Sequence, residues 1–316
     1  MPSPKKSSSA KHTDIAVIDI GSNSVRLVIY RIAKGRHKPV YEKKATCGLA
    51  RGMMHDNPRL NREGILIALK TLRIFGRILK KRKPKKVLAI GTAAMRAVIA
   101  TRKGRAFHRK AERALGHKIA IISGRKEARL TAYGVMAGLS KAAGVCGDLV
   151  GGSLELASIY RNHVRHTVTL PLGSLTLVSE SGGDPLRAEE IMHMRLNHVK
   201  WLGRMKGKTF YPIGGSWRAV ARVMMKKQSR NKLGPVHGFT IKAARAYKYA
   251  EAMARQKPAK FRKMHKKIRH RAGVIPYAAA VLAEIIIRMR PARITFSGRG
   301  VREGMVQDAI GSVRKQ

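Results

Sequence analysis

The stretch "GVCGDLVGGSLELASIYRN" (144–162) decides the fold. An apolar run ends at Asp148, a Val-Gly-Gly-Ser turn follows at 150–153, and Glu155 lies in a second apolar run. Two short apolar runs around a glycine turn are typical of a β-hairpin. We therefore expect a hairpin whose turn offers backbone N–H groups to an anion such as phosphate.

An earlier stretch, "AVIDIGSNSVRLVIYRI" (16–32), repeats this pattern. Asp19 aligns with Asp148, and Ser24 aligns with Ser153, at a constant offset of 129 residues. Each stretch reads as an apolar strand, an aspartate, a turn of small residues and a second strand. The chain is therefore predicted to contain an internal duplication.

A second pair of motifs follows the hairpins in the same order. "VLAIGTAAMRAV" (87–98) resembles "TFYPIGGSWRAV" (209–220), and in each a strand leads through a glycine into a helix. A helix N-terminus favours a bound phosphate, and arginine suits bidentate phosphate contacts. Arg96 and Arg218 lie in the first turns of these helices, so both are candidate phosphate ligands, with plain surface charge as the alternative.

The remaining pattern predicts two α/β halves that face each other across a cleft. Helical apolar spacing covers 64–81, a strand is expected at 118–124, and a crossover helix is expected at 125–139. We expect a disordered basic tail over residues 1–13, an N-terminal domain over 14–125 and a C-terminal domain over 126–316.

Charge is the most unusual property of the chain. Sixty-seven Lys and Arg against seventeen Asp and Glu give a formal net charge of +50. Such a surface attracts polyanions, which include RNA, inorganic polyphosphate and highly phosphorylated nucleotides. A solvated basic surface without a specific ligand is the alternative. Aromatic residues are only 5% of the chain, so a base-stacking platform is poorly supported.

Two runs are especially basic, "KKRKPKK" (80–86) and "RQKPAKFRKMHKKIRHR" (255–271). The first has the composition of a nuclear-import patch, although its place between a predicted helix and a predicted strand favours a charged loop. The second could coat an anion channel.

Four of the few acids, Asp19, Glu127, Asp148 and Glu155, fall in or beside the glycine turns and the crossover helix. Carboxylates beside phosphate turns make sense if they hold Mg²⁺ or activate water. Alternatively, the aspartates only cap their turns, and Glu127 only complements a helix dipole. Taken together, the four favour a functional site.

Cysteine and apolar patterns indicate the compartment. Cys47 and Cys146 are far apart and form no metal-type pair, so a reduced, cytoplasmic setting is expected. The chain has no uninterrupted run of 18 apolar residues, and its first residues lack the apolar middle of a secretory signal. We expect no membrane partner.

The ordered motifs "IDIGSNSVRL", "GTAAMR", "ISGRKEARL", "GDLVGGSLEL", "LPLGSLTL", "GGSWRA" and "FSGRGVREG" carry a family resemblance. From about residue 14 to 310 the chain resembles the short form of the exopolyphosphatase and guanosine pentaphosphate phosphatase family. The resemblance implies an actin-like α/β fold with two ribonuclease-H-like domains around a phosphate-binding cleft. It also implies a homodimer and Mg²⁺-dependent removal of terminal phosphate from polyphosphate or guanosine pentaphosphate.

The resemblance assigns roles to residues of this chain. It makes Glu127 the catalytic base, and Asp148 and Glu155 the metal and water-positioning acids, while Asp19 completes the expected metal set. The expected phosphate-binding positions are Gly21, Ser22, Asn23, Ser24, Arg96, Gly151, Gly152, Ser153, Gly214, Gly215 and Ser216.

Three positions depart from the family pattern. Val150 replaces a glycine, Lys126 replaces an acid before Glu127, and Ala100 replaces an asparagine. Valine is poorly suited to a positive φ, and Lys126 could either keep Glu127 ionised or pair with it. Two hypotheses follow: a phosphoanhydride hydrolase, or a catalytically impaired homologue that serves as a polyanion- or RNA-binding subunit of a ribonucleoprotein.

Overall fold

The computed structural model describes residues 12–33, 35–53, 58–228 and 234–311. Its first half contains a five-stranded sheet in the order β3-β2-β1-β4-β5. The first three strands form an antiparallel meander, while β4 pairs in parallel with β1, and β5 with β4. The strands are β1 (Thr13–Ile20), β2 (Ser24–Ala33), β3 (Arg36–Thr46), β4 (Lys86–Gly91) and β5 (Ala120–Ile121).

The second half repeats this topology in a six-stranded sheet of order β10-β11-β9-β6-β7-β8. β6, β7 and β8 form the antiparallel meander, β9 pairs in parallel with β6, β11 pairs in parallel with β9, and β10 adds an antiparallel edge. The predicted duplication is confirmed. The strands are β6 (Gly144–Leu149), β7 (Leu154–Tyr160), β8 (His163–Leu170), β9 (Thr209–Ile213), β10 (Thr240–Lys242) and β11 (Arg293–Thr295).

The two helices whose ranges the sequence predicted are present. The helices expected at 64–81 and 125–139 are α1 and α4, and side chains of Asn61 and Ser123 cap their N-termini. The strand expected at 118–124 is shorter, because β5 pairs with β4 through two residues only. The helices are α1 (Arg62–Arg82), α2 (Ala93–Val98), α3 (Arg102–Leu115), α4 (Gly124–Gly138), α5 (Ser174–Glu180), α6 (Pro185–Asn197), α7 (Gly215–Gln228), α8 (Ala243–Ala254), α9 (Pro258–Arg262), α10 (Lys266–Arg269), α11 (Ile275–Met289) and α12 (Val301–Ile310).

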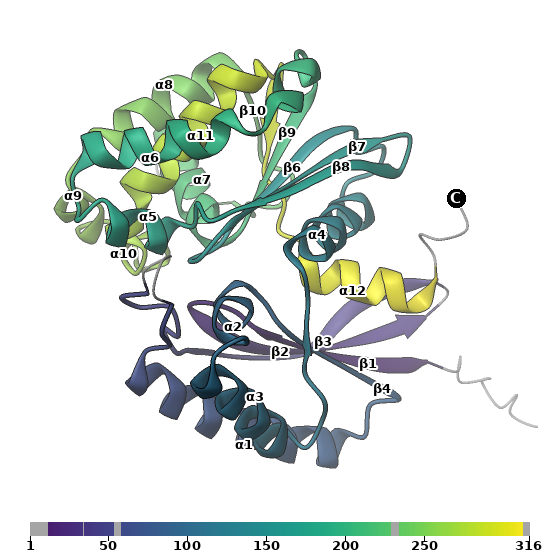
Figure 1. Cartoon of the computed structure of the whole chain (residues 1–316). Helices are drawn as coiled ribbons and strands as arrows, with labels where there is room; N and C mark the ends of the chain where they lie inside the picture. The colour runs from purple at the N-terminus through teal and green to yellow at the C-terminus, as the bar shows by residue number, and fades with distance from the viewer. Residues whose placement is uncertain (1–11, 34, 54–57, 229–233, 312–316) are drawn as a thin grey trace, which may run out of the picture.

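Two helices fill the space between the sheets (Figure 1). α4 packs on β6, β7 and β8 of the second sheet, and α12 packs on α4 and on β1 of the first sheet. The two helices cross closely, since a Cβ atom at Gly304 would lie 1.8 Å from the carbonyl oxygen of Leu130. Only a glycine fits at such a contact, so the crossing is specified by sequence.

The C-terminal helix thus returns to the first sheet. Val301, Met305 and Val306 are buried with Ile15 and Val17 of β1.

The domain boundary at 125/126 stays a prediction, and it lies within the first turn of α4. The expected basic tail lies mostly outside the described residues, and Thr13 already belongs to β1.

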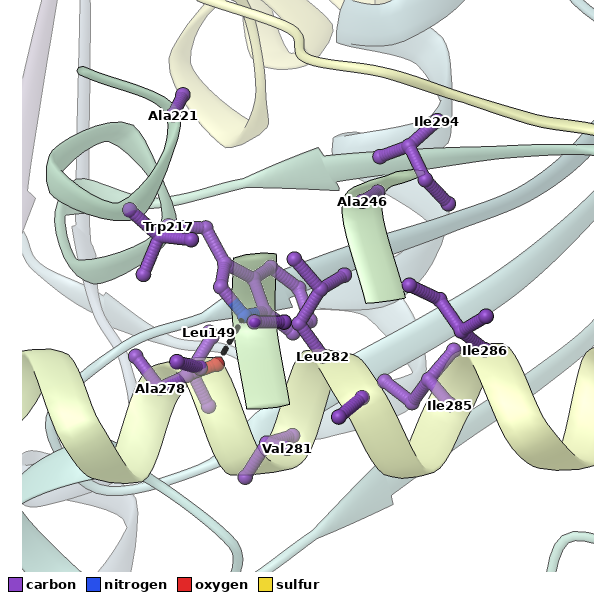
Figure 2. Close-up of a cluster of buried hydrophobic side chains, with 14 of the residues drawn as sticks. Leu149, Trp217, Ala221, Ala246, Ala278, Val281, Leu282, Ile285, Ile286 and Ile294 are labelled. Carbon is purple, nitrogen blue, oxygen red and sulfur yellow. Dashed lines mark hydrogen bonds between the residues drawn. The ribbon is translucent and has the colours of Figure 1, made fainter. Parts of the chain in front are cut away.

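A large apolar core holds the second half together (Figure 2). Trp217 on α7 is fully buried and donates a 2.8 Å hydrogen bond from its indole Nε1 to the carbonyl oxygen of Ala278 on α11.

Among the described residues, one helical stretch, 272–289, is long and apolar enough to cross a membrane. Two thirds of it is buried among α6, α7 and α8, which is the behaviour of a core helix.

Candidate active site

The turns of the two hairpins meet between the domains. A Cβ atom at Gly152 would lie 2.9 Å from the hydroxyl oxygen of Ser22, so the glycine allows this approach. Within the described part of the chain, the backbone N–H groups of Ser22, Asn23, Gly151 and Gly152 have no hydrogen-bond partner. Such clustered free amides are suited to bind an anion.

A pocket of about 110 Å³ opens beside these turns. It collects residues from both hairpins, from α4 and from the start of α7, as expected for a cleft between duplicated halves. The sequence-predicted residues that line it are Asp19, Gly21, Ser22, Asn23, Ser24, Glu127, Asp148, Gly151, Gly214 and Gly215.

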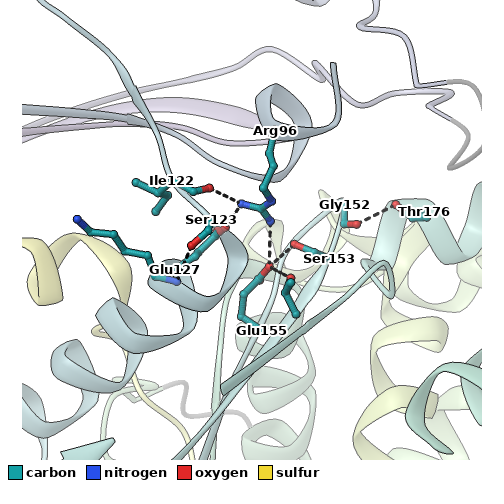
Figure 3. A network of polar contacts seen from close by, with 10 residues as sticks. Arg96, Ile122, Ser123, Glu127, Gly152, Ser153, Glu155 and Thr176 are labelled. Carbon is teal, nitrogen blue, oxygen red and sulfur yellow. Dashed lines mark hydrogen bonds and ion pairs between the residues drawn. The ribbon is translucent and has the colours of Figure 1, made fainter. Parts of the chain in front are cut away.

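Glu127 is the buried carboxylate at the start of α4. It is 2% exposed, and its Oε2 accepts a 2.9 Å hydrogen bond from Nη1 of Arg96, which also donates to the carbonyl oxygen of Ile122 (Figure 3). Burial raises the pKa of Glu127 well above its usual value, Glu155 raises it further, and Arg96 opposes the rise. A carboxylate in this setting is a stronger base than one in water.

Glu155 lies on the other side of Arg96. Its Oε1 is 3.6 Å from Nη2 of Arg96 and accepts hydrogen bonds from the hydroxyls of Ser153 and Thr169 (Figure 3). Burial raises the pKa of Glu155 to about 7. Glu155, Ser153 and Arg96 are not among the pocket-lining residues. They form a supporting layer behind Glu127.

Two aspartates reach the pocket from the ends of β1 and β6. Asp148 is 7% exposed, and its Oδ1 has no hydrogen-bond partner among the described residues. Burial raises its pKa to about 6. Asp19 accepts a 2.9 Å hydrogen bond from Arg302.

The expected metal set of Asp19, Asp148 and Glu155 does not gather into one cluster. In the described ranges, no group of three Asp, Glu, His or Cys residues is arranged to hold a metal ion. The reason is that Glu155 points toward Arg96, Ser153 and Thr169, while the two aspartates line the pocket.

The strand-to-helix turn before α7 contributes backbone groups. Gly214 has a φ of +97°, and a Cβ there would lie 2.4 Å from the carbonyl oxygen of Leu149, so glycine is required. Ser216 is fully buried, and its hydroxyl bonds that of Ser174 at 2.9 Å. Its side chain therefore serves packing, and it does not line the pocket.

Five basic side chains also line the pocket: Arg26, Lys44, Arg218, Arg271 and Arg302. Arg218 holds the helix position predicted from its motif, and Arg271 ends the basic run 255–271 that the sequence suggested for an anion channel. The other three were not singled out from the sequence. Burial, reinforced by neighbouring arginines, lowers the pKa of Lys44 to about 8 and that of Arg218 to about 10. Cations that repel one another in this way favour a shared polyanion between them.

The unusual residues at 150 and 126 are accommodated without strain. Val150 is absent from the described non-glycine residues with positive φ, and it lines the pocket. Lys126 is exposed, and Glu127 pairs with Arg96 instead. The lysine therefore plays neither of the two roles considered for it.

The pocket unites what phosphoryl transfer requires. A buried carboxylate can take a proton, free amides and arginines can hold phosphoryl oxygens, and acids can hold a hard cation.

Comparisons with known proteins show the family of the chain. The Ppx/GppA phosphatase family matches over residues 28–313. The guanosine-5'-triphosphate,3'-diphosphate pyrophosphatase of Aeromonas salmonicida is 25% identical over 313 residues, covering 94% of this chain. The corresponding Aeromonas hydrophila protein is also 25% identical, over 309 residues. The match covers 59% of each of these curated relatives, so the chain spans about three fifths of their length.

Solved structures share the fold. The Aquifex aeolicus PPX-GPPA enzyme superposes with a TM-score of 0.76 at 23% identity, covering 94% of this chain and all of that one. An exopolyphosphatase from Cytophaga hutchinsonii gives a TM-score of 0.82 at 18% identity, covering 96% and 98%. The expected two-domain α/β fold is thereby confirmed. With its family match running from β2 to the end of α12, the chain belongs to the Ppx/GppA phosphatase family.

Proposed function

We propose that the chain is a phosphoanhydride hydrolase that releases orthophosphate from the end of inorganic polyphosphate or guanosine pentaphosphate. The observation that carries this proposal is the buried Glu127 carboxylate in the wall of a pocket that also holds free turn amides and five cations. A buried carboxylate beside anion-binding turns and cations is what phosphoryl transfer requires. A surface that only binds polyanions would not require the carboxylate.

In the proposed mechanism, Glu127 accepts a proton from a water molecule whose oxygen attacks the terminal phosphorus. The bond from that phosphorus to the bridging oxygen breaks, and its electron pair leaves on the shortened chain. Turn amides at Ser22, Asn23 and Gly151 hold the terminal phosphoryl oxygens, while Arg218 and Arg271 balance charge on the leaving phosphate. Arg96 orients Glu127, and Glu155 acts through Arg96 as a positioning residue.

Mg²⁺ fits the same pocket. Among the described residues, Asp148 Oδ1 is buried without a hydrogen-bond partner, and Asp19 lines the pocket beside it. Mg²⁺ in phosphate enzymes commonly takes one or two carboxylates plus substrate oxygens. When bound, Mg²⁺ would offset negative charge on the phosphoryl oxygens. Glu155 is left out of this proposed ligand set because it does not reach the pocket.

The test is orthophosphate release by the purified protein with Mg²⁺, from long-chain polyphosphate and from guanosine pentaphosphate in parallel. Glu127→Gln should lower the rate about 10²- to 10⁴-fold, the range for loss of a general base. Glu189→Gln, an exposed glutamate on α6, is the matched control and should retain the wild-type rate. Absence of release from both substrates by the wild-type protein would refute the proposal.

A further inference from the structure

The segment 257–271 carries the most concentrated positive charge on the second domain. No Asp or Glu occurs between Glu251 and Glu284. We call the exposed cations of this segment the basic ridge. The ridge consists of Lys257, Lys260, Arg262, Lys263, Lys266, Lys267 and Arg269.

The ridge is a folded surface anchored to the core. Phe261 on α9 and Ile268 on α10 are buried in the second-domain core, and Met264 packs against the same cluster. These apolar residues turn the intervening cations to the opposite, solvent side. In the described ranges, no carboxylate forms an ion pair with a ridge side chain. The ridge therefore presents uncompensated charge at fixed positions.

The ridge leads into the pocket. Arg271 follows α10, its backbone N–H donates to the carbonyl oxygen of Ile268, and its side chain lines the pocket. Its guanidinium lies over the start of α7, since a Cβ at Gly215 would be 2.5 Å from Nη2. Lys44, from the first sheet, lines the same pocket. A row of cations thus runs from α9 and α10 into the cleft. α10 lies on the side of the second domain that faces the first domain (Figure 1).

We propose that the basic ridge binds the distal part of a long inorganic polyphosphate chain whose terminal phosphate occupies the pocket. The inference rests on the proposed hydrolase function and deepens it, because it favours a polymer over a nucleotide as the substrate. A linear polyanion with one negative charge or more per phosphate is complementary in charge to a row of cationic side chains. RNA suits the ridge less well, since its one aromatic residue, Phe261, is buried and offers no stacking surface.

The test compares two variants with the same change in charge. The ridge variant replaces Lys260, Lys263, Lys266 and Lys267 with Gln. The control replaces Lys80, Lys81, Lys85 and Lys86 with Gln. These control lysines are exposed and lie where β4 begins, and β4 runs parallel to β1, so they are at the end of the sheet opposite to Asp19.

Two readouts keep the inference separate from the proposed function. In phosphate release, the ridge variant should raise KM for long-chain polyphosphate at least tenfold but change kcat/KM for tripolyphosphate less than twofold. In direct binding to long-chain polyphosphate, which needs no turnover, the slope of log K against log salt should be shallower by about 3 for four lost contacts. The control should match wild type in both.

The inference is overturned if ridge and control variants bind long polyphosphate equally, or if the ridge variant loses the same factor on both chain lengths. It is also overturned if the ridge variant loses single-stranded RNA binding while its polyphosphate affinity stays at the wild-type value. Loss of phosphate release by every form, with the binding difference intact, refutes the hydrolase proposal and leaves the ridge assigned to polyphosphate.

Discussion

The guanidinium of Arg302 donates a 2.9 Å hydrogen bond to the carboxylate of Asp19, which joins residues 283 positions apart. Arg302 stands in the first turn of α12, and Asp19 stands near the end of β1. The neighbouring Glu303 accepts a 2.6 Å hydrogen bond from the Tyr30 hydroxyl on β2. The last helix therefore fixes an acid of the first hairpin, and the two halves share one site.

This pair should contribute to stability as well as to the site. In a double-mutant cycle of Arg302→Ala and Asp19→Asn, urea unfolding should give a coupling energy of about 1–3 kcal/mol, as for contacting residues in one network. The control cycle uses Arg31 and Asp14, an ion pair of 3.0 Å on the same hairpin that is more exposed. Its coupling should be much smaller, because water screens exposed pairs. Equal coupling energies for the two pairs would show that the Arg302–Asp19 contact does not stabilise the position of α12.

Arg96 should set the pH dependence of the reaction. Its hydrogen bond and charge lower the pKa of Glu127 against the effect of burial, so Arg96→Gln should raise that pKa further. The acidic limb of the kcat/KM profile should then move to higher pH. Arg96→Lys keeps the charge and should move the limb less. If kcat/KM fell at every pH while the acidic limb stayed in place, Arg96 would contact the substrate and would not set the pKa of Glu127.

Local sequence pattern predicted the two hairpins, their turns and the acids beside them, because each depends on neighbours in sequence. The hairpins at Asp19 and Asp148 follow from alternating apolar runs around small-residue turns. The cations Arg26 and Lys44 could not be singled out, since 67 Lys and Arg give no local contrast. Their convergence depends on how the two halves pack.

The same limit applies to the predicted metal set of Asp19, Asp148 and Glu155, which stays a prediction although the described residues do not gather it into one cluster. Sequence placed Glu155 next to a phosphate turn, and β7 does carry it there. The side chain, however, faces Arg96 and Thr169, contacts that bring together α2 and β8. Position along a strand fixes the side on which a residue lies, but the partner that it finds there is decided by tertiary packing.

Glu155 should make stability depend on pH. Its pKa is raised by burial to about 7 in the folded protein against an ordinary value of 4.5, so the folded state binds the proton more tightly. Its contribution to stability is therefore greatest below pH 4.5 and is lost as pH rises through 7, at no more than about 1.4 kcal/mol per pH unit.

The measurement is urea unfolding of metal-free protein between pH 5 and 8. Relative to wild type, Glu155→Gln should gain stability as pH rises, because the neutral amide carries no buried charge. Glu63→Gln, at an exposed position in the first turn of α1, should run parallel to wild type. A Glu155→Gln difference that is constant with pH would mean that Glu155 titrates alike in the folded and unfolded chains.

Val150 tests how closely the second hairpin turn approaches substrate. Its N–H donates to the carbonyl oxygen of Ser153 at 3.1 Å, its own carbonyl accepts from Ser174 at 2.9 Å, and its φ is not positive. The turn thus closes without a glycine, and Val150 lines the pocket. Val150→Gly should raise kcat/KM a few-fold and lower the free energy of unfolding by about 1 kcal/mol.

Val150→Ala distinguishes the effect of a smaller side chain from the effect of a more flexible backbone. Alanine removes the two γ carbons but keeps the restricted backbone, so it should give much of the gain in kcat/KM with less loss of stability. A gain with glycine alone would mean that the turn must flex to admit phosphate. Unchanged kinetics in both variants would mean that the valine side chain does not border the bound substrate, and the terminal phosphate would then have to lie nearer Asp19 and Ser22, on the side of the first hairpin.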